Sequence, residues 1–189
     1  MGVALSNCVK RSVRPVLCLA LALGSGRAAT LERLSIDDMI GKSTAIVRGR
    51  VTGSYAAFRG SVIHTYWKVQ VRESWKGPQQ ATVEVAIPGG VVNEYRQSFP
   101  GSPQLTEGKE YLLFLWTGRS GLTQIIGLTQ GIFDLPTNTT GDVMAVREAT
   151  ANTVLEAGTG RVVTDQRIEI RLKDLSTRIQ TNLAGGATK

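Results

Sequence analysis

The sequence predicts a mainly β protein: a small β-barrel of the oligonucleotide/oligosaccharide-binding type, with a short helix before the strands and a longer one after them. Segments in which apolar and polar residues alternate follow one another along most of the chain, and an apolar stripe with helical spacing occurs near its end. Glycines stand where a strand in a strongly curved sheet has to bend, at Gly49, Gly53, Gly127 and Gly131. A sandwich of two sheets is the alternative architecture.

The length and composition fit one folded domain. The chain has 189 residues, of which 42% are hydrophobic and 20% are charged. These values exclude an acidic disordered chain, a collagen-like repeat and a polytopic membrane protein. At about 150 residues per domain, the chain is long enough for one core and short for two.

Residues 1–28 have the three-part layout of a secretory signal peptide. Basic residues come first, at Lys10, Arg11 and Arg14. The apolar run at 16–23 is shorter than the ~18–20 residues that span a bilayer as a helix. Gly26 and Ala28 provide the small residues for cleavage after Ala28. We expect an exported protein, periplasmic or secreted, without a transmembrane span after cleavage; an uncut N-terminal helix is the alternative.

Cleavage there would change both the cysteine content and the charge. Cys8 and Cys18, the two cysteines of the chain, would leave with the signal peptide. The same segment holds four of the 22 Lys and Arg residues and none of the 15 Asp and Glu residues, so the formal net charge would fall from +7 to +3. The mature chain would therefore lack disulfides and most of the excess charge that favours a polyanionic partner.

The barrel domain is expected over 29–135 and begins with a short helix at 34–42. Ser35 is a suitable N-cap and Gly41 a suitable end for that helix. Two strands follow at 44–52 and 62–75, joined as a hairpin by a turn near 59–61.

Further strands complete the predicted barrel. Residues 81–87 alternate, whereas 98–108 are too rich in proline and glycine for regular structure. The segment 111–116 is apolar on both faces and is expected to be buried on both sides. Two short strands are predicted at 122–128 and 131–135.

The remaining residues fall into three parts. Residues 136–170 are expected to be a loop-rich extension with one strand at 143–147, because threonine, asparagine and glycine are frequent in its first part. Leu172, Leu175, Ile179 and Leu183 have helical spacing and predict a C-terminal helix at 171–183. Residues 184–189 are expected to be a flexible tail.

Several of these segments resemble a group of uncharacterised secreted bacterial β-barrel proteins. The segments are 45–51, 63–71, 75–77, 87–90, 99–103, 107–115 and 127–133. The first half also resembles the netrin-like domain of tissue inhibitors of metalloproteinases, which implies an OB-like barrel. Those inhibitors chelate zinc through an N-terminal Cys-x-Cys, whereas this mature chain would begin at Ala29 without cysteine. The resemblance therefore implies the fold and not the inhibitory mechanism.

The first hairpin carries a candidate binding face. Its residues are Arg48 and Arg50 on one strand and His64, Tyr66, Lys68 and Arg72 on the other. Basic residues beside an aromatic ring on a sheet are typical of surfaces that bind nucleic acid or an acidic glycan. The alternative is a solvated sheet face whose charge is balanced by Glu73 and Glu84.

A polar loop forms a second candidate, a binding rim. It follows Pro88-Gly89-Gly90 and comprises Asn93, Glu94, Tyr95 and Arg96. The alternative is a turn with a short edge strand.

The chain contains no complete catalytic motif. His64, the single histidine, is expected on the exposed face, and no catalytic residue, metal site or cofactor is predicted. We therefore expect an exported, non-enzymatic module that binds a protein or envelope partner. Polyanion binding through the hairpin face and an unrecognised hydrolase activity are the alternatives.

Overall fold

A computed structural model describes residues 29–186, so the predicted signal peptide and the last three residues lie outside the described part. The elements are β1 (Thr30–Glu32), α1 (Ile36–Lys42), β2 (Ala45–Arg59), β3 (Val62–Lys76), β4 (Thr82–Pro88), β5 (Gly90–Val92), β6 (Tyr95–Gln97), β7 (Glu110–Thr117), β8 (Thr123–Ile125), β9 (Ile132–Asp134), β10 (Met144–Arg147), β11 (Thr153–Leu155), β12 (Val162–Val163), β13 (Ile168–Arg171) and α2 (Leu172–Gly186). The prediction of a mainly β fold with one helix before the main strands and one after them is confirmed.

One eight-stranded sheet forms the framework. Its strands follow the order β13-β10-β9-β7-β2-β3-β4. The strand β8 pairs with residues 115–117 of β7, whereas β9 pairs with residues 111–113. β4 lies beside β8, but no hydrogen-bonded pairing joins the two strands. Within the described residues the ring of strands is thus not closed, and the arrangement is consistent with the predicted alternative, a two-sheet sandwich.

Two hydrophobic cores lie on opposite sides of β7. Leu112 and Phe114 belong to the core that includes residues of α1 and α2, while Leu113 and Leu115 belong to the core inside the curve of β2, β3 and β4. Consecutive residues of a strand point to opposite faces. This explains why the strand is apolar on both faces, as predicted, although the burial ends before Trp116, which is 47% exposed.

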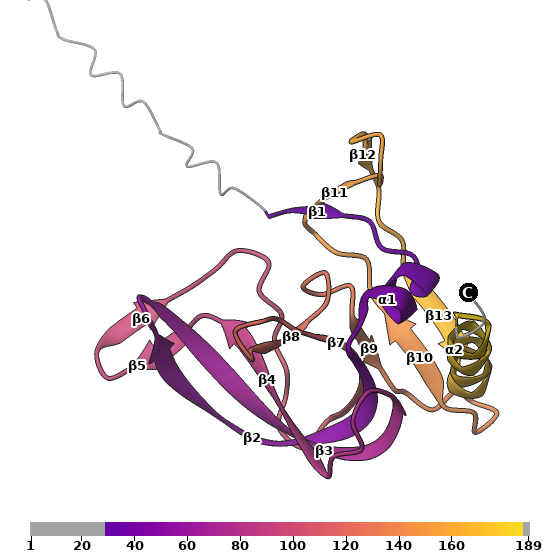
Figure 1. The fold of residues 1–189 in the computed structure, drawn as a ribbon, viewed down its shortest axis with the longest axis horizontal. Helices are drawn as coiled ribbons and strands as arrows, with labels where there is room; N and C mark the ends of the chain where they lie inside the picture. The colour runs from indigo at the N-terminus through magenta and orange to yellow at the C-terminus, as the bar shows by residue number, and fades with distance from the viewer. Residues whose placement is uncertain (1–28, 187–189) are drawn as a thin grey trace, which may run out of the picture.

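The β2–β3 hairpin is the longest feature and extends across the molecule to the hairpin of β5 and β6 (Figure 1). β2 is longer than the predicted 44–52, because its register with β3 continues to Arg59 opposite Val62. Three register irregularities bend the pair, one of them between Arg48 and Gly49. A Cβ atom at Gly49 would come within 2.6 Å of the Gln70 carbonyl oxygen, so the close approach of the two strands requires glycine.

The segment 136–170, expected to be loop-rich, contributes β10, β11, β12 and part of β13. β10 and β13 extend the main sheet, and β11 pairs in parallel with β1 at the other end of the chain. β10 corresponds to the strand predicted at 143–147, whereas β11, β12 and β13, with two to four residues, are too short to show a periodicity.

The two helices pack against each other beside β10 and β13 (Figure 1). α1 has the predicted N-cap: the Ser35 hydroxyl accepts from the Asp38 N–H, and the Asp38 carboxylate accepts from the Ser35 N–H. α1 ends at Lys42 and not at Gly41. α2 continues three residues beyond the predicted 171–183 and buries Leu172, Leu175 and Ile179. No helix among residues 29–186 is long and apolar enough to cross a membrane.

Candidate binding surfaces

The predicted basic face of the hairpin is interleaved with carboxylates. Arg48 donates to Glu110 and to Glu73, each at 2.6 Å, and Arg72 Nε lies 3.5 Å from Glu110. Partial burial lowers the pKa of Arg48, but the hydrogen bonds with Glu110 and Glu73 outweigh this effect and raise the pKa overall. These cations are already neutralised within the sheet, which reduces the attraction for a polyanion.

The next part of the same face is aromatic. The rings of Tyr55 and Tyr66 stack at 5.1 Å, and Lys68 Nζ lies 5.6 Å from the centre of the Tyr55 ring. The Tyr55 hydroxyl donates to Glu84 at 2.9 Å, and this hydrogen bond raises the tyrosine pKa because it stabilises the protonated phenol. The structure therefore brings Tyr66 and Lys68 together, with Tyr55 and Glu84 as additional members.

Two other predicted residues of this face behave differently. Arg50 is exposed and forms no ion pair among residues 29–186. His64, expected on the exposed face, is 8% exposed, and that prediction is wrong. In the sheet it lies between Ala57 of β2 and Pro88 of β4, inside a three-stranded region. Its Nδ1 atom is buried without a hydrogen-bond partner. A general base would need a hydrogen bond to the group that it deprotonates, and Nδ1 makes none.

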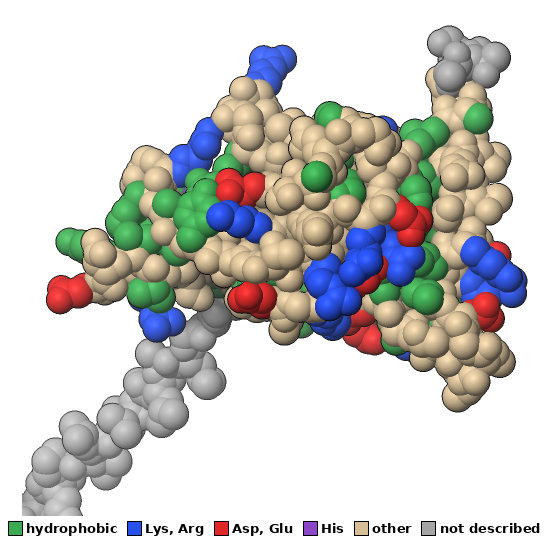
Figure 2. Space-filling view, turned by 90° about the horizontal axis from the view of Figure 1, so that it is seen from below, with side chains coloured by type: hydrophobic (Ala, Val, Ile, Leu, Met, Phe, Trp, Pro, Cys, Tyr) green, Lys and Arg blue, Asp and Glu red, His purple; other side chains and the backbone are tan. Residues whose placement is uncertain are grey.

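The far end of the hairpin exposes a group of large apolar side chains, which we term the aromatic end. Its members are Phe58, Val91 and Tyr95, which are 46%, 45% and 68% exposed, whereas Tyr55, 44% exposed, lies on the opposite face of β2 beside Tyr66. The rings of Phe58 and Tyr95 meet edge to face at 6.0 Å, which joins β2 to β6. Figure 2 shows apolar side chains gathered toward the end of the molecule that carries β5 and β6, and Lys and Arg beside Asp and Glu elsewhere on the same face.

The predicted rim is the β5–β6 hairpin. Asn93 has a positive φ of 53° in the turn, Glu94 follows it, and Tyr95 and Arg96 open β6. The structure therefore contains the turn and the short strand that were predicted as the alternative to a binding rim. The segments 88–91 and 96–99 also frame a cleft of about 490 Å³ that Arg96 and Trp67 line.

Sequence reasoning missed Tyr55, Phe58 and Val91 as surface residues. Tyr55 and Phe58 lie beyond the alternating segment 44–52, although the aromatic residues before the predicted turn were a usable indication. Val91 becomes part of the surface only because β5 packs beside β2. The local sequence contains no pattern that indicates this contact.

Metal-ligand geometry is not evident in the described chain. Within residues 29–186, no three His, Cys, Asp or Glu side chains are grouped so that they could hold a metal ion.

Comparison of the chain with models of protein families, with curated proteins and with solved structures gives no match.

Proposed function

We propose that this chain is an exported, non-enzymatic binding module that recognises a protein partner through the aromatic end. The observation that carries the proposal is the exposure of Phe58, Val91 and Tyr95 on adjacent strands at one end of the molecule. Gathered apolar groups on a surface mark contact sites, and tyrosine is enriched at the centres of protein interfaces.

The aromatic end is held in a defined shape before any partner arrives. Phe58 packs against Tyr95, and the Gln97 side chain of the same strand as Tyr95 accepts from the Ile63 N–H and donates to the Ser61 carbonyl of the hairpin. Ordered rings lose little conformational freedom on binding, so more of the free energy of contact is available for affinity. This supports a protein interface of modest size centred on the rings.

The hairpin face supports polyanion binding less well. Glu73, Glu84 and Glu110 lie among its basic residues, and Arg48 and Arg72 form ion pairs with these carboxylates. A polyanion would have to displace these carboxylates from their ion pairs or be repelled by their negative charge.

Site-specific photo-crosslinking in the producing cells tests the proposed interface. A photoreactive phenylalanine analogue at Tyr95 should give a defined adduct with one protein. The matched control places the analogue at Trp116, which has an exposure similar to that of Phe58 but lies at the opposite end of the paired strands. In the Tyr95 background, Phe58→Ala should reduce the adduct several-fold. Equal adducts from both positions, or an adduct insensitive to Phe58→Ala, would contradict the proposal.

A further inference from the structure

The cleft beside the β5–β6 hairpin, which we term the rim cleft, adjoins the aromatic end. Its volume is about 490 Å³, within the roughly 300–1,000 Å³ of ligand sites. Three parts of the chain line it: strands β3 and β4 through Trp67 and Ile87, the loop 98–104, and the β5–β6 hairpin through Arg96. Val91 belongs both to this lining and to the aromatic end, so the two surfaces are continuous.

The pairing of β5 with β6 directs Arg96 into the rim cleft. Arg96 lies opposite Val91 in the register, so both side chains stand on the same face of the small hairpin. The next residue, Gln97, points to the other face. There it accepts from the Ile63 N–H at 2.7 Å and donates to the Ser61 carbonyl at 2.9 Å. The face that carries Arg96 is therefore turned away from the β2–β3 turn and toward the cleft.

The Arg96 guanidinium is an uncompensated cation. It is exposed, and within residues 29–186 it forms neither an ion pair nor a side-chain hydrogen bond. Glu94, two residues earlier in the chain, forms no ion pair with it. The planar fork of N–H donors on an arginine matches the two oxygens of a carboxylate. Arg96 therefore favours a ligand that carries a carboxylate.

Trp67 supplies a second donor to the lining. Its side chain is half-buried, but its indole nitrogen retains solvent-accessible area. The indole N–H has no acceptor in the described part of the chain, whereas that of Trp75 donates to Glu73 at 3.3 Å. Arginine and tryptophan side chains can donate but cannot accept hydrogen bonds, so the ligand has to provide the acceptors.

Much of the remaining lining is apolar. It includes the side chains of Ile87, Pro88, Val91, Phe99 and Pro103. Phe99 is 39% exposed, so part of its ring is open to a ligand. Covering such a surface releases free energy in proportion to the apolar area removed from water. A ligand with an apolar group beside its carboxylate would use both parts of the cleft, whereas a small inorganic anion would use only the donors.

Hydrogen bonds and close packing hold the edges of the rim cleft in place. The Thr65 hydroxyl donates to the Gly89 carbonyl at 2.8 Å. The Ser102 hydroxyl donates to the Pro88 carbonyl at 2.9 Å. Gly90 has a φ of 142°, and a Cβ atom there would lie 2.7 Å from Thr65 Oγ1, so the hairpin can approach β3 this closely only with glycine. The cleft is therefore preorganised for a ligand.

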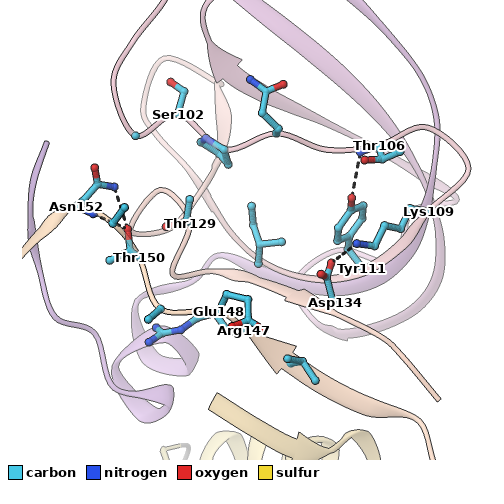
Figure 3. Close-up of a pocket in the computed structure, with 17 residues that line it drawn as sticks. Ser102, Thr106, Lys109, Tyr111, Thr129, Asp134, Arg147, Glu148, Thr150 and Asn152 are labelled. Atoms are coloured by element: carbon cyan, nitrogen blue, oxygen red, sulfur yellow. Dashed lines mark hydrogen bonds and ion pairs between the residues drawn. The ribbon is translucent and has the colours of Figure 1, made fainter. Parts of the chain in front are cut away.

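A neighbouring cavity of about 440 Å³ shares residues 102–104 with the rim cleft but has no free cation. Figure 3 shows its lining, in which Lys109 pairs with Asp134 at 2.8 Å. Arg147, also in this lining, pairs with Asp165 at 2.6 Å. Of the two cavities, only the rim cleft leaves a cation available to an anionic ligand.

We propose that the rim cleft receives an acidic side chain of the protein partner. Its carboxylate binds Arg96 and the indole N–H of Trp67, and a neighbouring apolar side chain of the partner packs on Phe99. This inference rests on the proposed function, since Val91 joins the cleft to the aromatic end. A partner surface that lies on the aromatic end can reach the cleft with a side chain and needs no free chain end.

A matched pair of peptides tests the rim cleft without the partner. The protein purified after export is titrated with acetyl-Phe-Glu-amide and acetyl-Phe-Gln-amide, each up to tens of millimolar, and binding is followed by NMR. The glutamate peptide should shift the indole N–H signal of Trp67 with saturable binding, about five-fold more tightly than the glutamine peptide at low salt. Added sodium chloride should reduce this preference. Trp67→Phe assigns the signal.

Substitutions of arginine show whether Arg96 causes the preference. Arg96→Gln should abolish the preference for the glutamate peptide, and Arg96→Lys should retain part of it. The matched control is Arg119→Gln, because Arg119 is also exposed and forms no ion pair within residues 29–186, but lies in the turn between β7 and β8. The inference is overturned if the natural chain binds both peptides equally, or if Arg96→Gln and Arg119→Gln show the same preference. Tighter binding of acetyl-Gly-Phe, which has a free terminal carboxylate, would overturn it in favour of a chain end.

Photo-crosslinking at Tyr95 separates this inference from the proposed function. If both hold, Arg96→Gln reduces the Tyr95 adduct several-fold and Arg119→Gln leaves it unchanged. An adduct that is insensitive to Arg96→Gln overturns the inference and leaves the aromatic end as the interface. Absence of an adduct from the natural chain contradicts the proposed function, whatever the peptides show.

Discussion

Arg147 on β10 and Asp165 after β12 form an ion pair at 2.6 Å whose side chains are only 4% and 2% exposed. The same aspartate accepts from the Thr150 N–H, so one buried carboxylate orders both the arginine and the backbone at Thr150. Removing one partner of a buried pair leaves an uncompensated buried charge. The pair therefore determines the conformation of the segment that follows β10.

We expect Asp165→Asn to lower the free energy of unfolding by about 3–5 kcal/mol in urea denaturation. The matched control is Asp174→Asn, which breaks the exposed pair with Arg171 and should cost less than about 1 kcal/mol. Similar losses in the two variants would show that the buried pair has no special role.

The capping box of α1 predicts a second stability effect. Ser35→Ala removes the acceptor for the Asp38 N–H and should destabilise the protein by about 1 kcal/mol. Ser98→Ala, in an exposed loop position, is the control and should be nearly neutral. Thermal unfolding monitored by circular dichroism measures both, and an unchanged midpoint for Ser35→Ala would contradict a stabilising cap.

Acid should weaken the junction of the two helices. The pKa of Asp37 is lowered by its hydrogen bonds with Arg178, and the pKa of Asp38 is lowered by its hydrogen bonds with Ser35. A lowered folded pKa means that the ionised group stabilises the folded state. That contribution is complete above the ordinary pKa of 3.8 and is lost as the pH falls through the lowered folded values.

Urea midpoints recorded between pH 7 and pH 2 test this dependence. The double variant Asp37→Asn with Asp38→Asn should lose less stability than the natural chain over the acid part of that range. An identical acid profile for the two proteins would assign the loss to other groups.

The bend of the long hairpin gives a prediction with a matched pair of glycines. Gly49→Ala would place a Cβ atom 2.7 Å from Val69 Cγ1 and should cost about 1–3 kcal/mol through overpacking. Nothing lies within 4 Å of the corresponding position at Gly53, so Gly53→Ala should have little effect. Equal urea midpoints for the two variants would show that the strands can separate freely at Gly49.

The carboxylates on the hairpin face lead to a prediction about polyanions. Because Arg48 is paired with Glu73 and Glu110, the double variant Arg48→Ala with Lys68→Ala should change retention on a heparin column only slightly. The salt concentration at elution is the measurement. A strong retention that disappears in the variant would instead favour polyanion binding by this face.

The accuracy of the sequence predictions depended on the range of the interactions involved. The hairpin, the doubly buried β7 and both helices follow from local periodicity and capping, so residues such as Ser35 and Leu113 were interpretable in their own segments. The strand β11 could not be predicted from its own segment, because its parallel partner β1 lies near the other end of the chain.

The candidate site shows the same division. The turn at Asn93 and the cluster of Tyr66 with Lys68 could be predicted. Glu73 was foreseen as a carboxylate that balances this face, whereas the burial of His64 and the pairing of Arg48 with Glu110 depend on which strands lie alongside, because Glu110 comes from β7, far along the chain.

Gln130 links distant parts of the chain. Its side chain is 1% exposed, accepts from the Leu34 N–H and donates to the Glu32 carbonyl, spanning 96 and 98 residues. A polypeptide that emerges N-terminus first from a ribosome or translocation channel must leave residues 32–34 unattached until Gln130 has followed. The domain therefore completes its folding only after most of its chain has emerged. Before that point its exposed apolar segments are most at risk of aggregation.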